Sequence, residues 1–388
     1  MNTIEKFNNH VMPSYGRYDL VIDEGSGREC TDENGKTYID FGSGIGTNSL
    51  GYCDEEWVNA ICEQAHKIQH TSNYYYTKVQ ADFADKLCSM TGYSKMFFGN
   101  SGAEANECAI KLARKYSFDK YGKGRHNIIT LVNSFHGRTL CTLSATGQDT
   151  FHNYFFPFVD GFINVEANNI EDLKAKIDDT VCAVMFEFIQ GEGGVVPLNQ
   201  DFIDAIFKIC GEKDILTIAD EVQTGVGRSG KFLSAEHFGV KANITTLAKG
   251  LAGGVPIGAC LADEKCCDVL TKGTHGSTFG GNPISCAGGN AVLKKLSNPG
   301  FLDEVSEKGK YLKNKLLEID EIEKVDGMGL MLGASLKTKN APDVVKAALD
   351  NGLLLLTAKE KLRFLPPLTI SYDEIDKGIE ILKKLISE

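Results

Sequence analysis

Two polar residues, an acid and an amine, close two short apolar runs in the middle of this chain. The run from Ile215 to Ala219 is followed by Asp220, and the run from Ile244 to Ala248 is followed by Lys249. Short apolar runs rich in β-branched residues favour buried strands. Because ligands collect at the carboxyl ends of strands in open α/β sheets, we expect both side chains at one edge of a sheet.

A carboxylate and a lysine in this arrangement suit the chemistry of pyridoxal 5'-phosphate. The lysine can attach the cofactor as a Schiff base, and the acid can pair with the nitrogen of the pyridine ring. Either residue alone is explained at least as well by a strand that simply ends in a polar side chain. The hypothesis therefore depends on companions elsewhere in the chain.

The length and composition indicate a globular protein of two domains. A chain of 388 residues exceeds what one core usually serves, and its 42% hydrophobic and 24% charged residues are an ordinary soluble balance. A net charge of −11 argues against nucleic acid or an anionic membrane as the main partner. No apolar stretch approaches the ~18 residues of a membrane span, and the N-terminus lacks a signal-peptide pattern.

The twelve cysteines are scattered, and no C-x-x-C pair occurs. This spacing predicts no metal site, and a disulfide scaffold is not expected at this chain length. We expect free thiols in a reducing cytoplasm.

Segments with strand and helix patterns alternate up to about residue 290. Such alternation predicts an α/β fold whose large domain has a mostly parallel sheet with helices on both faces. From about residue 291, amphipathic helices with short strand-like runs indicate a smaller α+β domain. We predict an N-terminal segment (1–50) packed with the small domain, a large cofactor-binding domain (51–290) and a small C-terminal domain (291–388).

A candidate phosphate site lies at the segment Gly99–Glu104, which follows the apolar run Met96–Phe98 and opens a helical pattern. Ser101 and Glu104 have the spacing of a capping box. A glycine-containing helix N-terminus offers free N–H groups and the positive end of the helix dipole to a phosphate. A plain, well-capped helix would have the same sequence.

A second candidate segment, Ser134–Thr139, follows a predicted strand at 127–132. The Phe135 ring could stack on a flat cofactor, and Arg138 could bind a substrate carboxylate with two hydrogen bonds. Core packing is the alternative for Phe135.

Two further polar loops could complete a site: Gln190–Gly194, after the predicted strand Val181–Phe186, and Gly276–Pro283. The segment Gly225–Gly230 matches the dinucleotide pattern G-x-G-x-x-G. It does not open a long helix, because Gly239 interrupts the pattern within nine residues, so we discount it.

Taken in order along the chain, these motifs resemble the class III aminotransferases, which are fold-type I enzymes that use pyridoxal phosphate. The resemblance covers essentially the full length. It rests on six motifs: Ser101–Glu104, Phe135–Thr139, Gln190–Gly193, Asp220–Gln223, Ala248–Gly250 and Ser277–Pro283. Within the family, the chain is most similar to members that transfer the terminal amino group of N-acetylornithine to 2-oxoglutarate in arginine biosynthesis.

The resemblance implies roles around the cofactor ring. Lys249 would hold the cofactor covalently and move the proton between it and the substrate carbon. Asp220 would keep the ring nitrogen protonated, and Gln223 would face the phenolic oxygen. Val222 and Phe135 would enclose the ring between them.

The resemblance also implies how the phosphate is held. Ser101, Gly102 and Ala103 would bind it at the helix N-terminus. Thr278 would reach the phosphate of a neighbouring subunit, so the active unit is expected to be a homodimer with shared active sites.

For the substrates, the resemblance implies that Arg138 and Ser277 hold N-acetylornithine. Arg363 would receive the 2-oxoglutarate carboxylate nearest the reacting carbon. Since the amine donor has no carboxylate at that position, Glu192 would neutralise Arg363 during the first half-reaction and release it in the second.

Other functions stay open from the sequence alone. Ornithine, succinylornithine or 4-aminobutyrate aminotransferases share the chemistry and differ only at the distal part of the pocket. A nicotinamide-dependent oxidoreductase using the glycines at 225–230 and a cofactor-binding protein without catalysis are alternatives of different classes.

Overall fold

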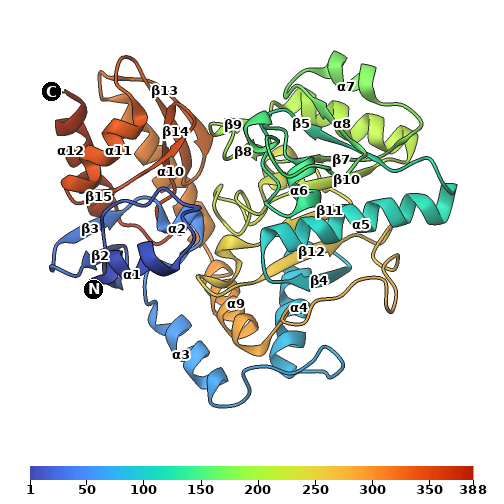
Figure 1. Ribbon diagram of the computed structural model, residues 1–388, viewed down its shortest axis with the longest axis horizontal. Coiled ribbons are helices and arrows are strands. Elements are labelled where there is room, and N and C mark those ends of the chain that lie inside the picture. Colours follow the sequence, from blue (N-terminus) through green and yellow to red (C-terminus); the bar gives the residue numbers. More distant parts are fainter. Residues whose placement is uncertain (388) are drawn as a thin grey trace.

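A seven-stranded sheet forms the centre of the larger part of the computed structural model, which describes residues 1–387 (Figure 1). Strand β12 is antiparallel to both of its neighbours, and every other neighbouring pair whose direction is defined is parallel, which confirms the mostly parallel sheet. In spatial order the strands are β4 (Lys95–Gly99), β12 (Gly258–Ala262), β11 (Ile244–Leu247), β10 (Leu216–Asp220), β7 (Val181–Phe186), β5 (Asn127–Leu131) and β6 (Phe162–Val165).

Helices cover both faces of this sheet because its strands are apolar on both sides. Every residue of β7 is buried. In β5, Ile128 belongs to the apolar cluster that includes residues of α5 (Gly102–Tyr121), whereas Ile129 belongs to the cluster that includes residues of α8 (Gln200–Lys213). The period of two residues along a strand thus divides the core into two layers. The shorter helices of this part are α6 (Leu140–Ala145), α7 (Ile170–Lys176), η1 (Asp149–Phe151) and η2 (Ser234–Phe238).

A helical group packs beside the edge strand β4. Helix α9 (Pro283–Leu296) contacts α3 (Glu55–Ala65), α4 (Lys78–Thr91) and the short helix η3 (Lys249–Ala252). Through these contacts, the segment that follows β11 packs against α9, the last helix of the larger part.

The C-terminal part is a four-stranded antiparallel sheet with helices. Its strands are β13 (Ile322–Met328), β14 (Met331–Leu336), β17 (Lys361–Phe364) and β16 (Leu356–Ala358), and its helices are α10 (Phe301–Leu317), α11 (Ala341–Asp350) and α12 (Tyr372–Ser387). The short strands β8 (Ile189–Gln190) and β9 (Val196–Pro197) form a two-stranded ribbon, and β9 contacts β13 of the C-terminal part. The predicted boundary at residue 290 stays a prediction, and α9 runs across it.

The N-terminal residues form a second four-stranded sheet that includes one strand from the C-terminal part. After α1 (Thr3–His10), the strands β1 (Ile22–Ser26), β2 (Glu29–Asp32) and β3 (Thr37–Asp40) lead to α2 (Ser43–Gly46). Strand β3 pairs in parallel with β15 (Leu353–Leu354). Both chain ends therefore lie on the same side of the molecule in Figure 1.

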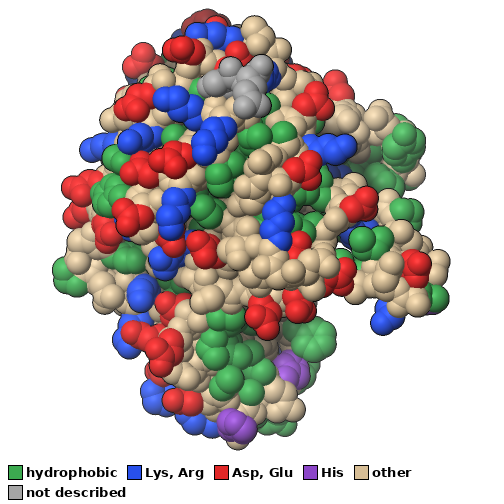
Figure 2. All heavy atoms as spheres, turned by 90° about the vertical axis from the view of Figure 1, so that its left-hand side faces the viewer, with side chains coloured by type: hydrophobic (Ala, Val, Ile, Leu, Met, Phe, Trp, Pro, Cys, Tyr) green, Lys and Arg blue, Asp and Glu red, His purple; other side chains and the backbone are tan. Residues whose placement is uncertain are grey.

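Acidic and basic side chains are interspersed on the face that carries the chain ends, and neither sign forms a continuous field there (Figure 2). Among residues 1–387, none of the helices combines the length and the apolar character needed to cross a membrane.

Candidate active site

A cavity of about 400 Å³ lies at the carboxyl ends of the central strands, within the usual range of small-molecule sites. Asp220 is the last residue of β10, Glu187 directly follows β7, and Lys249 follows β11 by two residues. All three line the cavity. The other lining residues come from the start of α5 and from the loops after β3, β4, β5, β10, β11 and η3, and they are Thr47, Asn100, Ser101, Gly102, Ala103, Asn106, Phe135, His136, Gly137, Arg138, Val222, Gln223, Ala248 and residues 254–257.

One wall of the cavity is the N-terminus of α5. Ser101 is its N-cap, and the Ser101 hydroxyl accepts a hydrogen bond from the Glu104 N–H at 3.2 Å. The expected capping box is incomplete, because the Glu104 carboxylate accepts from the Asn100 N–H at 2.8 Å and not from that of Ser101. Only glycine fits at position 102, where a Cβ would lie 2.6 Å from Cγ1 of Val222. The helix thus presents its first N–H groups to the cavity at close range.

A network of hydrogen bonds holds Asp220, which is buried. Its Oδ2 atom pairs with Nδ1 of His136 and accepts from Nδ2 of Asn106, both at 2.8 Å. The other oxygen accepts the Val222 N–H at 3.1 Å. The Thr246 hydroxyl donates to the amide oxygen of Asn106 at 2.7 Å and orients that side chain. The carboxylate is therefore fixed before any ligand arrives.

Lys249 opens η3 with a φ of 46°, a left-handed conformation that few non-glycine residues adopt. Lys249 is half-buried, and desolvation by the surrounding protein holds the pKa of its amine below the ordinary value. Glu192 and Asp220 oppose the shift, whereas Arg363 adds to it. Desolvation favours the neutral amine, which is the nucleophilic form.

Two polar side chains, Arg363 and Glu192, extend the site beyond Gln223. Arg363, buried in β17, donates from Nη1 to Oε1 of Glu192 at 2.5 Å. Gln223 donates to the same oxygen at 3.3 Å. Burial raises the pKa of Glu192, but the charge and hydrogen bond of Arg363 outweigh it, and the net pKa lies below the ordinary value. Arg363 and Glu192 thus form the ion pair that the family resemblance implied.

Arg138 lies over two aromatic rings at the cavity. Its guanidinium is 4.1 Å from the ring centroid of Phe151 and 5.6 Å from that of Phe135. These cation–π contacts hold the charged group in place at the cavity.

Besides Glu192 and Arg363, two more predicted site residues, Ser277 and Thr278, do not line this cavity. Both line a separate hollow of about 750 Å³. Ser277 is connected to the first cavity by Asn100, whose amide donates to the Ser277 hydroxyl at 3.1 Å. Among the described residues, Thr278 makes no hydrogen bond with a residue that lines the cavity of its own chain.

The glycines at 225–230 serve packing. No α-helix follows them directly, and a turn leads into η2. A Cβ at Gly230 would lie 2.1 Å from Oγ of Ser306 in α10, and one at Gly227 would lie 3.0 Å from the Leu302 side chain. The segment therefore brings the large part close to the C-terminal part.

Three polar residues of the site were not predicted from the sequence as site residues. Glu187 follows a strand as Asp220 does, so the strand-end signal was present. His136 and Asn106 contact Asp220, but neither a histidine in a turn nor an asparagine inside a helix has a distinctive spacing.

One cavity is lined by the carboxylate of Asp220, the amine of Lys249 and the N-terminus of α5 at Gly102. This set of groups suits pyridoxal phosphate. The fold and the site are those of a fold-type I transferase that uses this cofactor. The sequence profile described as "Aminotransferase class-III" matches residues 11–386. The chain belongs to this family, whose members depend on pyridoxal phosphate.

Individual relatives are similar over nearly the whole chain. Acetylornithine aminotransferase of Haemophilus ducreyi is 50% identical, over 98% of this chain and 97% of the relative. Its counterpart in Caldanaerobacter subterraneus subsp. tengcongensis is 46% identical, over 100% and 99%. Ornithine aminotransferase from Toxoplasma gondii has a crystal structure with a TM-score of 0.94 and 31% identity, with 99% and 94% covered.

Proposed function

We propose that this enzyme transfers the terminal amino group of N-acetyl-L-ornithine to 2-oxoglutarate, giving N-acetyl-L-glutamate 5-semialdehyde and L-glutamate in arginine biosynthesis. The observation that carries the proposal is the pair of Arg363 and Glu192 next to Gln223, since a paired arginine suits a site that takes two different substrates in turn. The names of the relatives support this donor.

Pyridoxal phosphate supplies a ring that accepts the electron pair of the substrate carbon. The residues of this chain supply the charge and the proton transfer. Lys249, with its lowered pKa, gives and takes the proton at the reacting carbon. Asp220, held by His136 and Asn106, keeps a proton on the ring nitrogen.

The remaining contacts position the cofactor. The N-terminus of α5 at Ser101, Gly102 and Ala103 would hold the phosphate, because free N–H groups and the helix dipole converge there. Phe135 and Val222 would enclose the ring, and the Gln223 amide would face its phenolic oxygen.

Two substrates share this site through the Arg363–Glu192 pair. With N-acetylornithine bound, Glu192 neutralises Arg363, because the reacting end of this substrate has no carboxylate. Arg138 and Ser277 would bind the far end of the donor. When 2-oxoglutarate enters, its carboxylate replaces Glu192 on Arg363.

We propose that the working unit is a homodimer with shared sites. Thr278 lies away from the cavity of its own chain, its own loop exposes Phe279, and the loop before α4 exposes Tyr74 and Tyr76. Exposed aromatic side chains of this number are typical of an interface. The free cysteines suit a reducing compartment, so we propose the cytoplasm as the location.

A substrate panel tests the choice of donor. Purified enzyme is assayed with 2-oxoglutarate and with N-acetylornithine, ornithine, succinylornithine or 4-aminobutyrate. We expect kcat/KM for N-acetylornithine to exceed that for ornithine by about tenfold or more, a difference of ~1.4 kcal/mol in transition-state binding. A clear preference for free ornithine or 4-aminobutyrate would contradict the proposal, and a clear preference for succinylornithine would move it to that donor.

A further inference from the structure

A buried carboxylate in the cavity wall has no role in the mechanism above. Glu187 directly follows β7, is 5% exposed and lines the cavity. Its side chain makes no hydrogen bond to a cationic group among the described residues. A buried acid without such a partner is costly, so its presence needs an explanation.

Each carboxylate oxygen of Glu187 accepts a hydrogen bond from a different loop. Oε2 accepts from the Phe135 N–H at 3.1 Å, and Oε1 accepts from the Gly191 N–H at 3.2 Å. The first loop carries the ring proposed to stack on the cofactor. The second carries Glu192, the proposed partner of Arg363. One side chain thus joins the two loops.

Close packing allows these loops little independent movement. A Cβ on Gly193 would lie 2.6 Å from the carbonyl oxygen of Asn133, and one on Gly191 would lie 2.5 Å from Oε1 of Gln223. The Gln190 side chain also donates to the Val132 carbonyl at 2.8 Å. A shift of either loop would therefore displace the other.

The charged groups that act on Glu187 come from three neighbouring segments. The net pKa of Glu187 is raised to about 7, and burial is the main cause; the charge of His136 opposes the rise, and nearby Asp220 adds to it. The negative charge of Glu187 in turn raises the pKa of Lys249, which lies on the segment after β11. Only the ionised carboxylate has two equivalent acceptor oxygens for the two N–H groups.

We propose that Glu187 is a positioning residue that fixes the ring-stacking loop and the Glu192 loop together through the N–H groups of Phe135 and Gly191. This inference rests on the roles proposed above for Phe135 and Glu192. It makes cofactor stacking and the exchange of substrates depend on one side chain that need touch neither ligand.

Hydrogen exchange in the cofactor-free protein tests the two tethers directly. In Glu187→Gln the amide oxygen can accept one N–H, but the NH2 group opposes the other. We expect exchange to rise about tenfold in at least one of the segments 131–138 and 188–195, as loss of a buried hydrogen bond implies.

Glu221→Gln is the matched control. Glu221 is also buried and accepts two backbone N–H groups, those of Ser234 and Ala235. We expect this variant to loosen residues 232–237 and to leave 188–195 protected. The inference would be overturned if both segments of Glu187→Gln exchanged at the wild-type rate. It would also be overturned if exchange were faster throughout the protein, including α9.

Half-reaction kinetics supply the second readout. Glu187→Gln should slow the single-turnover reactions with N-acetylornithine and with glutamate alike, and it should speed the release of the cofactor. An effect on only one half-reaction would contradict joint positioning. Failure of the substrate panel would change the donor and leave the exchange result standing, whereas failure of the exchange experiment would remove the role of Glu187 and leave the donor unaffected.

Discussion

At the scale of single residues, we propose that the balance of charge around Arg363 selects which substrate the site accepts. The guanidinium is buried, and one of its nitrogens, Nε, has no hydrogen-bond partner among the described residues. Glu192 is the only acid within ion-pair distance of it in that part of the chain. Leaving Arg363 unpaired would be costly, so we expect the donor complex to depend on Glu192 more than the 2-oxoglutarate complex does.

Glu192→Gln tests this dependence. Glutamine keeps a hydrogen-bonding oxygen for Arg363 but removes the charge. We expect the half-reaction with N-acetylornithine to slow by about tenfold or more, while the half-reaction with glutamate changes less, because its own carboxylate pairs with Arg363. Single-turnover assays of each half-reaction measure the two effects, with Glu192→Asp as the charge-preserving control. Equal changes in both half-reactions would count against the exchange of partners on Arg363.

The sequence predicted the strand-end residues of the site because their position depends on local order alone. Asp220 and Lys249 each follow a short apolar run, and parallel strands bring such ends to one edge. Asn106 and His136 escaped prediction because their importance comes from Asp220, which lies 84 residues or more away in the chain. A contact of that kind leaves no periodic pattern.

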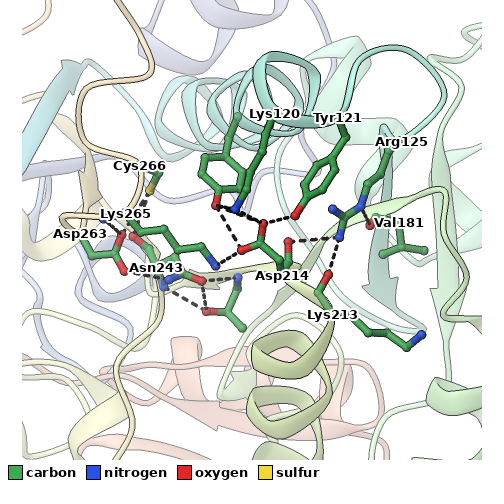
Figure 3. Close-up of polar contacts among 12 residues, drawn as sticks. Lys120, Tyr121, Arg125, Val181, Lys213, Asp214, Asn243, Asp263, Lys265 and Cys266 are labelled. Atoms are coloured by element: carbon green, nitrogen blue, oxygen red, sulfur yellow. Dashed lines mark hydrogen bonds and ion pairs between the residues drawn. The ribbon is translucent and has the colours of Figure 1, made fainter.

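At the scale of elements, one acid connects several segments at the edge of the sheet opposite the cavity (Figure 3). Asp214 ends α8 with a φ of 53°. Its carboxylate accepts from Lys120 and Lys265, both at 2.7 Å, and from the Tyr121 hydroxyl. Arg125 donates to the backbone carbonyl of Asp214 at 3.1 Å. This cluster joins the end of α5 to the turn that leads into β10.

Asp214→Asn should destabilise the fold without disturbing the turn. Asparagine tolerates the left-handed conformation, so the main loss is the charge that Lys120 and Lys265 share. We expect a loss of about 1 kcal/mol in the free energy of unfolding at pH 7. The loss should be smaller than for a fully buried ion pair, because the cluster is partly exposed to solvent. Urea unfolding measures it, and Glu212→Gln, on the exposed side of α8, is the control.

The pH dependence gives a second check on Asp214. Partial burial raises the pKa of this carboxyl, but the hydrogen bonds from Lys120, Lys265 and Tyr121 outweigh it and hold the pKa below its ordinary value. Its stabilisation is therefore complete above the unfolded-state pKa of about 3.9 and is lost as pH falls through the lower folded value. The gap between wild type and Asp214→Asn should narrow below about pH 4. A gap that stays constant down to pH 3 would contradict this origin.

The sequence predicted the central strands to within a residue, because their apolar runs are continuous and bounded by polar residues. Strand β7 has the predicted bounds Val181–Phe186, and β10 begins one residue later than the predicted run and includes Asp220. The glycine-rich stretch near residue 45 gave no such guidance. There Ser43, Gly44, Ile45 and Gly46 all have positive φ. A β-branched residue rarely adopts that conformation, so only tertiary contacts such as that of the Ser43 hydroxyl with the Leu365 carbonyl explain the turn.

At the scale of the whole molecule, Thr278 lies away from the cavity of its own chain, and we propose that it serves the site of a second subunit. The loop that carries it is held by Asn73, whose amide donates to the carbonyl oxygens of Ser277 and Gly280 at 3.1 and 3.0 Å. Tyr74 and Phe279 beside it are 92% and 60% exposed. A firmly held polar loop with exposed aromatic side chains suits contact with a second copy of this chain, related by twofold symmetry.

Mixing two inactive variants tests whether the sites are shared. Lys249→Ala lacks the amine, and Thr278→Asp places a negative charge where the proposed phosphate contact lies. If Thr278 serves the neighbouring subunit, a mixed dimer has one site with both native residues. After unfolding and refolding an equal mixture, random pairing should restore ~25% of wild-type activity, because half of the dimers are mixed and each has one complete site. Lys249→Ala mixed with Asp220→Asn is the control, since both residues line the same cavity of one chain and no site can recover. Activity of the first mixture that does not rise above that of its parents would show that Thr278 does not act across the dimer.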